Sequence, residues 1–291
     1  MTHNMKNIPS KFEQFTDYSP TWCPGCGNWA IGAVIKRALG ELGLDPSSIF
    51  VSFGIGCSGN MNDFLNAYAI HGLHGRAIPT AIGFKFANHK MPVLVIAGDG
   101  DCFGEGGNHF LHAARGNHDI TIITHDNSVY GLTTGQAAPT ANKGYKSKST
   151  PFGLIETPLN PLALAISQGA TFAAQGYASH VPQLKSLIKK ATQHKGFSIV
   201  NILQPCVTFN HYNTYDYYDS KTYLLSNKHD AKNQQLALKR AMEATTVERF
   251  SLGILYNVKR PAFHEQLPQL AQETLLHRER FTGIDSILFS S

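Results

Sequence analysis

Two polar residues that could bind a metal ion each follow a stretch of sequence that looks like a buried strand. Asp99 stands between two glycines directly after the apolar run 92–97, and Asn127 follows the run 119–125. Carboxylate and amide oxygens are ligands that Mg²⁺ accepts, and protein-bound Mg²⁺ often keeps substrate phosphates as further ligands. The glycines let the backbone approach a diphosphate, and the start of a helix adds amide donors. A lone G-D-G is most often only a turn, but G-D-G followed after 26 residues by this Asn is much rarer and predicts a Mg²⁺–diphosphate site.

Four of the five cysteines fall where a metal centre could form. Cys23 and Cys26 form a C-x-x-C pair, Cys57 follows the first expected strand, and Cys206 follows the last one. Four thiolates suit either a structural Zn²⁺ or a [4Fe–4S] cluster, and their spacing alone does not decide between the two. No strand precedes the C-x-x-C pair, which argues against a thioredoxin-like role. The fifth cysteine, Cys102, is expected to be a small buried residue.

The elements that must position these residues alternate between strands and helices. Short apolar, β-branched runs predict buried strands at 49–53, 92–97, 119–125 and 197–203. Apolar periodicity predicts helices at 28–42, 79–87, 105–115, 161–168, 182–194 and 230–249. Asn28 is expected to cap the first of these helices. This alternation predicts an α/β fold with a doubly wound parallel sheet.

In such a sheet, ligands bind at the carboxyl ends of the strands. The loops 54–59, 98–101, 126–132 and 204–206 all follow expected strands. We therefore expect the metal-binding residues and the cysteines to meet at one edge of the sheet.

Length allows one large domain or two ordinary ones for these 291 residues. We expect 1–206 to form the domain that binds the cofactor and the metal centres. Residues 207–291 are expected to be a C-terminal extension that packs on this domain or on a partner subunit. Residues 1–20 are expected to lie on the surface as an arm, and 131–160 to form a long functional loop.

Composition excludes several classes of protein. With 42% hydrophobic and 15% charged residues, the chain cannot be a disordered one. The net charge of +5 is spread out, so we expect no nucleic-acid partner. No apolar run is long enough to span a membrane and no signal peptide is visible, so we expect a cytoplasmic protein. The low charged fraction indicates that a partner covers part of the surface.

The chain resembles the beta subunits of 2-oxoacid:ferredoxin oxidoreductases in seven strings spread over nearly its whole length. These strings are W-C-P-G-C-G at 22–27, G-I-G-C-S-G at 54–59, L-H-G-R at 73–76, G-D-G-D at 98–101, D-N-S-V-Y-G-L-T-T-G-Q at 126–136, Q-P-C-V-T-F-N at 204–210 and G-I-L-Y at 253–256.

This resemblance implies a thiamine diphosphate-binding fold and a set of ligands. It implies that the four thiolates hold a [4Fe–4S] cluster and not zinc, and these are Cys23, Cys26, Cys57 and Cys206. It implies that Mg²⁺ is bound by Asp99, Asn127 and the carbonyl oxygen of Val129. The contacts to thiamine diphosphate that it implies come from Ile55, Gly56, Cys57, Ser58, His74, Gly100, Asp101, Gly131 and Leu132.

The resemblance also implies an activity and partners. The reaction would be the coenzyme A-linked oxidative decarboxylation of a 2-oxo acid, with electrons passed through the cluster to ferredoxin. The string Y-G-L-T-x-G-Q favours 2-oxoglutarate as the substrate. Thr134 stands where many relatives have lysine, which puts any contact made by that lysine in doubt here. The glutamate that activates thiamine lies in a separate pyrimidine domain in this family, so we expect an alpha subunit to supply it.

His74 is the candidate catalytic residue, expected to contact the cofactor or the carboxylate of the substrate. Arg76 could bind that carboxylate or form a structural ion pair. Two other interpretations stay open. A non-redox thiamine diphosphate enzyme would leave the four cysteines unexplained, and a zinc-stapled interaction module without catalysis would leave the spacing of Asp99 and Asn127 without a purpose.

Overall fold

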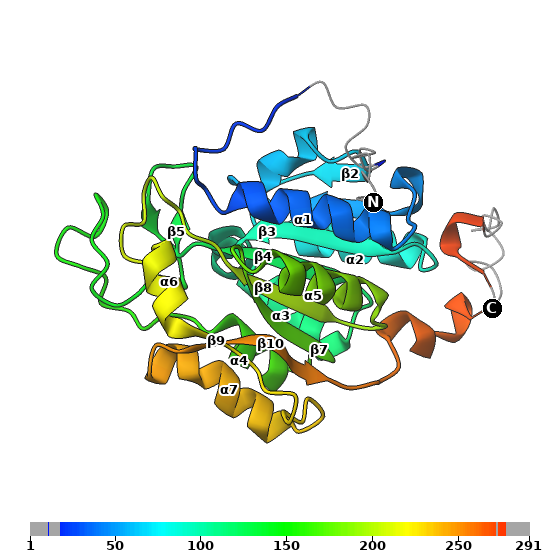
Figure 1. The fold of residues 1–291 in the computed structure, drawn as a ribbon. Coiled ribbons are helices and arrows are strands. Elements are labelled where there is room, and N and C mark those ends of the chain that lie inside the picture. The colour runs from blue at the N-terminus through cyan, green and yellow to red at the C-terminus, as the bar shows by residue number, and fades with distance from the viewer. Residues whose placement is uncertain (1–10, 12–17, 272, 278–291) are drawn as a thin grey trace, which may run out of the picture.

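An eight-stranded sheet covered by helices forms the frame of the protein (Figure 1). The computed structural model describes residues 11, 18–271 and 273–277. The strands of the sheet are β1 (Phe50–Phe53), β2 (Tyr68–His71), β3 (Val93–Gly98), β4 (Thr121–Asp126), β7 (Phe172–Tyr177), β8 (Ser198–Leu203), β9 (Thr222–Leu224) and β10 (Phe250–Asn257). They lie side by side in the order β2-β1-β3-β4-β8-β7-β10-β9. Neighbouring strands run parallel, except that β10 runs antiparallel to β7.

Each face of the sheet is covered by its own set of helices. One buried cluster is formed with α1 (Asn28–Glu41) and α5 (Val181–Gln193). The other is formed with α2 (Ala77–Ala87), α3 (Gly107–Gly116), α4 (Pro161–Ser167) and α7 (Gln234–Thr246). Side chains alternate between the two clusters along a strand: Val51 and Phe53 of β1 join the first, and Phe50 joins the second. Strands β1, β4, β7 and β8 are buried at every residue because both faces are covered.

The predicted α/β class and doubly wound sheet are confirmed, and the predicted helices are present with small shifts of their ends. Strands β2, β7, β9 and β10 were not predicted. The sequence of β7, F-A-A-Q-G-Y, is rich in residues that favour strands little. It becomes a strand because β8 and β10 pair with it on either side.

The segment after residue 206 is more regular than its sequence pattern indicated. It contains α6 (Tyr215–Lys221) and α7, and it adds β9 and β10 to the main sheet. Helix α7 is shorter than the predicted helix 230–249, because the side chain of Asn233 accepts a hydrogen bond from the backbone of Leu236 and caps it there.

The N-terminal cap of α1 differs from the prediction. Gly27 occupies the cap position without a side-chain hydrogen bond, so Asn28 does not cap the helix. The side chain of Asn28 is buried, and its Oδ1 lies 2.7 Å from Nδ1 of His125 at the end of β4. Asn28 therefore joins the start of α1 to the edge of the sheet where the site lies.

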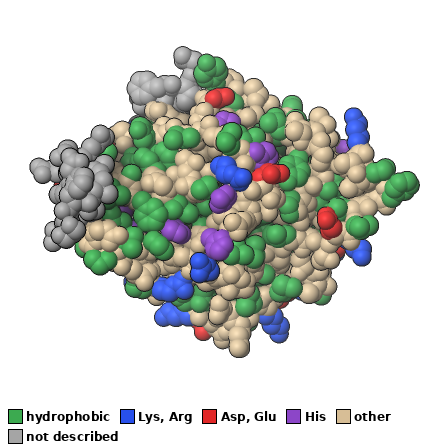
Figure 2. Space-filling view, turned by 180° about the vertical axis from the view of Figure 1, so that it is seen from behind, with side chains coloured by type: hydrophobic (Ala, Val, Ile, Leu, Met, Phe, Trp, Pro, Cys, Tyr) green, Lys and Arg blue, Asp and Glu red, His purple; other side chains and the backbone are tan. Residues whose placement is uncertain are grey.

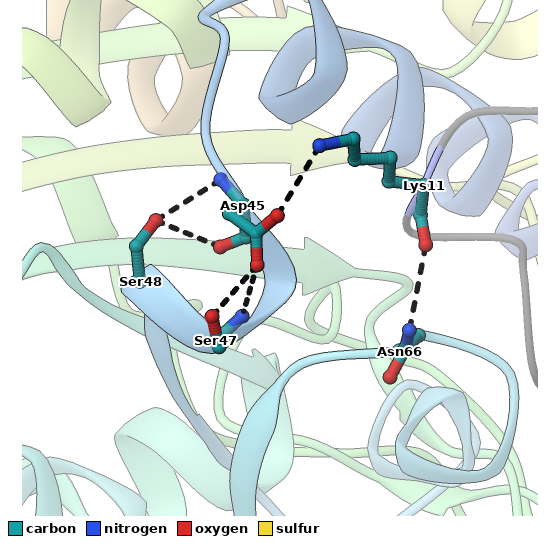
Figure 3. A network of polar contacts seen from close by, with 5 residues as sticks. All are labelled: Lys11, Asp45, Ser47, Ser48 and Asn66. Carbon is teal, nitrogen blue, oxygen red and sulfur yellow. Dashed lines mark hydrogen bonds and ion pairs between the residues drawn. The ribbon is translucent and has the colours of Figure 1, made fainter.

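The predicted N-terminal arm, 1–20, falls mostly outside the described residues. Lys11, which is described, is attached at two points (Figure 3). Its Nζ lies 3.3 Å from Oδ2 of Asp45, and its carbonyl oxygen accepts a hydrogen bond from Nδ2 of Asn66 at 3.4 Å. An exposed ion pair of this kind contributes little to stability, because water and salt screen the two charges.

Candidate cofactor and metal site

A cavity lies at the carboxyl ends of β1, β3 and β4, where the loops that follow these strands meet. Every residue that the sequence predicted as a cofactor contact lines it, and so do the three predicted Mg²⁺ ligands, Asp99, Asn127 and Val129. We call it the strand-end cavity. Its position is the one expected for a ligand site in a parallel α/β sheet.

Asp99 and Asn127 are both buried and held by local hydrogen bonds. Oδ2 of Asp99 accepts hydrogen bonds from the backbone N–H of Ser128, at 2.9 Å, and from the hydroxyl of Thr140. Oδ1 of Asn127 accepts one from the backbone N–H of Val129 at 3.0 Å. Ser128, at φ +62°, turns the chain so that this bond can close.

The electrostatic setting of Asp99 suits a cation. Burial, and then the neighbouring carboxylate of Asp126, raise the pKa of Asp99 well above its ordinary value. An opposite charge placed beside such a carboxylate favours its ionised form. A divalent cation bound here would therefore remove the main cost of burying two neighbouring carboxyl groups.

Asp101 joins two loops that line the cavity. Its Oδ1 accepts hydrogen bonds from the backbone N–H groups of Ile55 and Gly75, each at 2.9 Å, and lies 3.0 Å from Nδ1 of His74. Burial raises the pKa of Asp101, and the two backbone bonds oppose this shift. Gly54 is needed for the arrangement, because a Cβ at this position would lie 2.3 Å from Oδ2 of Asp101.

A π-helical turn, Gly100–Glu105, follows β3 and carries Asp101 into the site. The predicted helix 105–115 therefore begins differently, with this turn first and α3 from Gly107. Single π-helical turns are frequent at functional sites. Cys102 lies in the turn and is buried in the apolar core, as predicted.

Two further residues discussed from the sequence lie outside the cavity lining. The guanidinium of Arg76 donates hydrogen bonds to the carbonyl oxygens of Gly75 and Glu105, at 3.3 and 3.2 Å. Arg76 thus has a structural role in this conformation. Thr134 is exposed and has a left-handed backbone, with φ +77°, in the loop between β5 (Val129–Tyr130) and β6 (Gln136–Ala137).

The four cysteines predicted to bind a metal centre come from three loops that lie against one another. The backbone N–H of Gly27 donates to the carbonyl oxygen of Pro205 at 3.2 Å, which ties the C-x-x-C loop to the loop after β8. A Cβ at Gly131 would lie 3.5 Å from Sγ of Cys57 and 3.8 Å from Sγ of Cys206. The cysteine loops therefore border the strand-end cavity at Gly131 and Cys57, both of which line it.

The thiols of this group act on one another. Burial above all, and then the neighbouring thiols, Cys206 and Cys23 among them, together raise the pKa of Cys26 and of Cys57 to about 11. All cysteines of the described chain are free thiols. Within the described residues, no group of three or more His, Cys, Asp or Glu side chains is arranged to hold a metal ion. Binding of iron or zinc would deprotonate the thiols.

Two polar residues that line the cavity, His125 and Gln204, were not predicted as site residues. The ring Nε2 of His125 and the hydroxyl of Ser58 are buried without a hydrogen-bond partner, and burial lowers the pKa of His125 to about 3. Ser58 was predicted as a cofactor contact, whereas His125 and Gln204, which is buried beside it, were not. His125 stands inside a predicted strand and looked like a core residue. The signal that could have found the two missed residues is their place, two residues from Asn127 and from Cys206 at strand ends.

Two known protein families match the chain. Residues 54–202 match the family described as "Thiamine pyrophosphate enzyme, C-terminal TPP binding domain". Residues 206–272 match the family that describes the C-terminal part of the pyruvate ferredoxin oxidoreductase beta subunit. A 2-oxoacid:ferredoxin oxidoreductase subunit beta from Sulfolobus sp is 44% identical over 265 residues, which cover 87% of each chain. The chain belongs to the 2-oxoacid:ferredoxin oxidoreductase beta subunits.

Other relatives agree with membership of this beta-subunit family. The subunit beta of the same kind of enzyme from Saccharolobus solfataricus is 51% identical over 206 residues, covering 70% of this chain and 68% of that one. A solved structure, the 2-oxoglutarate:ferredoxin oxidoreductase from Magnetococcus marinus with 2-oxoglutarate, coenzyme A and succinyl-CoA bound, superposes with a TM-score of 0.89. It is 36% identical, and the match covers 99% of this chain and 98% of that chain. The family resemblance predicted from the sequence is thereby confirmed.

Proposed function

We propose that this chain holds the thiamine diphosphate, Mg²⁺ and [4Fe–4S] sites of an oxidoreductase that acts on a 2-oxo acid. One 2-oxo acid and one coenzyme A would give one acyl-CoA, CO₂, a proton and two electrons, which two oxidised ferredoxins would accept one at a time. The observation that supports this most is that the loops of the four cysteines and the Asp99–Asn127 pair border the same strand-end cavity.

Bound thiamine diphosphate would supply the carbanion and electron-sink chemistry. The residues of this chain would hold it: Asp99, Asn127 and the carbonyl oxygen of Val129 would bind Mg²⁺ on the diphosphate. The unpartnered polar atoms of Ser58 and His125 fit a cavity that takes a polar ligand, because buried polar groups normally have partners. A carboxylate with a raised pKa, on Asp99, fits a cation site.

His74 would contact the cofactor or the carboxylate of the substrate. Its Nδ1 is held by Asp101 and its ring lines the cavity. With Nδ1–H donating to Asp101, Nε2 is the remaining ring nitrogen and can accept a hydrogen bond, or donate one after protonation. Asp101 would thus orient the ring while keeping two loops of the cavity together.

The four cysteines would bind the cluster, and Cys23, which is exposed, lies on the side from which an electron acceptor could approach. Free thiols from three neighbouring loops are the donor set that a [4Fe–4S] cluster uses. The names of the related enzymes include ferredoxin as their partner. Free thiols and a cluster also suit the reducing cytoplasm. No helix in the described part of the chain has the length and apolarity to cross a bilayer.

An alpha subunit would complete the site and supply the activating glutamate. Strand β2 is an edge of the sheet, and Tyr68 and Ile70 on it are exposed. Leu73, which follows β2 and precedes His74, is 76% exposed. Apolar side chains are also spread over the face shown in Figure 2, among histidines and scattered charged side chains. Within the described residues β2 pairs with β1 alone, and an apolar sheet edge of this kind beside the cavity is a surface that a partner covers.

We propose 2-oxoglutarate as the preferred substrate. The solved structure with 36% identity is that of an enzyme bound to 2-oxoglutarate, coenzyme A and succinyl-CoA. The sequence string Y-G-L-T-T-G-Q at 130–136 points to the same substrate.

The test is turnover by the complex of this chain with its alpha subunit. We expect 2-oxoglutarate to drive ferredoxin reduction only when coenzyme A is present, and to do so faster than pyruvate. Asp99→Ala should abolish thiamine diphosphate binding, measured by calorimetry, and turnover with it. Asp230→Ala, at a residue that does not line the cavity, should leave both unchanged. Repeated turnover of 2-oxoglutarate to CO₂ without any electron acceptor would contradict the proposal.

A further inference from the structure

One side chain connects the predicted Mg²⁺ site with the predicted cluster site. Oε1 of Gln204 accepts a hydrogen bond from Nδ2 of Asn127 at 3.3 Å, and Nε2 of Gln204 donates to Sγ of Cys26 at 3.2 Å. We call these three residues the Gln204 bridge. We propose that Gln204 is a positioning residue that raises the reduction potential of the cluster and couples it to occupancy of the Mg²⁺–diphosphate site. This inference rests on the proposed function.

The direction of the bridge is fixed by its surroundings. Oδ1 of Asn127 accepts the backbone N–H of Val129, so its Nδ2 is the atom that faces Gln204. The amide oxygen of Gln204 must then face Asn127, because two amide nitrogens cannot bond to each other through their hydrogens. This leaves the amide nitrogen of Gln204 to face the sulfur of Cys26.

The side chain of Gln204 is also held in place. Its backbone N–H donates to the carbonyl oxygen of Asp126 at 2.8 Å, which continues the pairing of β8 with β4 by one residue. The residue is 1% exposed. Gly27 leaves the space that it fills, since a Cβ at Gly27 would lie 2.7 Å from Cγ of Gln204. The bridge is therefore part of the packed structure and needs no rearrangement to form.

A hydrogen bond to a ligating sulfur favours the reduced cluster. Reduction adds one negative charge to the cluster and its thiolates, so an N–H donor stabilises the reduced state more than the oxidised one. A cation bound at Oδ1 of Asn127 would polarise that amide and strengthen the donors further along the bridge. Loading the Mg²⁺–diphosphate site should therefore make the cluster easier to reduce.

The test uses the complex with the alpha subunit and reads the cluster directly. Dithionite supplies one electron to each oxidised cluster in a mediated titration, and the reduced cluster is counted by electron paramagnetic resonance. Gln204→Met keeps the approximate length of the side chain but removes the donor to sulfur. Gln193→Met makes the same exchange at the end of α5, away from the cavity, and serves as the control.

We expect the reduced-to-oxidised ratio of Gln204→Met to fall about tenfold at a given potential, a shift of about 59 mV for a one-electron couple. Adding thiamine diphosphate with Mg²⁺ should raise the midpoint potential of the wild-type cluster. The same addition should raise the midpoint potential of Gln204→Met much less. A second variant, Gln204→Glu, keeps an acceptor toward Asn127 but turns an anionic oxygen toward the sulfur, so its midpoint should be lower still. It also provides the test if the Met variant does not assemble its cluster.

Failure of this inference differs from failure of the proposed function. If wild type and variants contain the same iron and share one midpoint, the bridge has no effect on the cluster and the inference is wrong, while the proposed function stands. If the wild-type complex contains no iron, both are wrong. A midpoint that falls in Gln204→Met but responds to thiamine diphosphate as in wild type would overturn the coupling.

Discussion

Replacement of Asp101 removes a carboxylate that joins the loops of Ile55 and Gly75 at the strand-end cavity. In Asp101→Ala both backbone N–H groups lose their acceptor. Gly75 is buried, and a buried donor without a partner costs about 1–3 kcal/mol. Ile55 is half-buried at the cavity, so its lost bond costs about 0.5–1.5 kcal/mol, and we expect the free energy of unfolding to fall by about 1.5–4.5 kcal/mol in total. Asp101→Asn keeps an acceptor oxygen. Since burial raises the pKa of the carboxyl group, the uncharged amide avoids part of that burial cost, and we expect it to lie within about 1 kcal/mol of wild type.

Urea denaturation of the chain without cofactor measures these differences. Thiamine diphosphate titration of the three proteins should give the same order, because both joined loops line the cavity: wild type strongest, Asp101→Asn weaker, and Asp101→Ala weakest. An unchanged urea midpoint and slope for Asp101→Ala would refute the reasoning, since it would mean that the two N–H groups find other partners at no cost.

Three other predictions concern other parts of the chain. Lys85→Met should lower the free energy of unfolding by about 3–5 kcal/mol, because the buried carboxylate of Asp119 loses a partner at 2.8 Å. The exposed side chain of Lys195 lies 3.7 Å from the same carboxylate, so Lys195→Ala should lower the free energy of unfolding by less than about 1 kcal/mol. Equal urea midpoints for the two variants would contradict this. Burial lowers the pKa of His194 below its ordinary 6.5, so the unfolded chain binds the proton more readily and stability present above about pH 6.5 is lost as the pH falls. His194→Gln should lose less stability than wild type between about pH 7.5 and about pH 5.5, and an identical loss would oppose the argument. Leu73→Asp should weaken assembly with the alpha subunit on gel filtration while the melting temperature of the isolated chain stays unchanged; full assembly would place the interface elsewhere.

Much of the site could be predicted because its residues follow locally recognisable strands. Asp99 and Asn127 each come after a short apolar run, and parallel strands bring such positions to one edge of the sheet. The structure places both on the strand-end cavity, with the predicted cofactor contacts around them. Their roles as ligands stay predictions, as do those of the cysteines.

The features that the sequence did not predict depend on contacts between segments that are distant in the sequence. Strands β7 and β10 form because they pair with each other although they lie far apart in the sequence, and weak local propensity gives no sign of this. Asp101 joins its two loops from a π-helical turn, and the sequence pattern did not predict this turn. Gln204 and His125 line the cavity, and each is held by a residue from far back in the sequence, Cys26 and Asn28 respectively.

The most direct test of the account is the iron, sulfide and zinc content of the beta chain, purified without oxygen in complex with its alpha subunit. We predict about four irons and about four sulfides for the four cysteines of each beta chain, with a broad brown absorbance and no zinc. The iron and sulfide content should each fall by about four per beta chain in a variant with Cys57 and Cys206 replaced by serine. One zinc per beta chain and no iron would contradict the account, because electrons could then not leave the strand-end cavity through these cysteines.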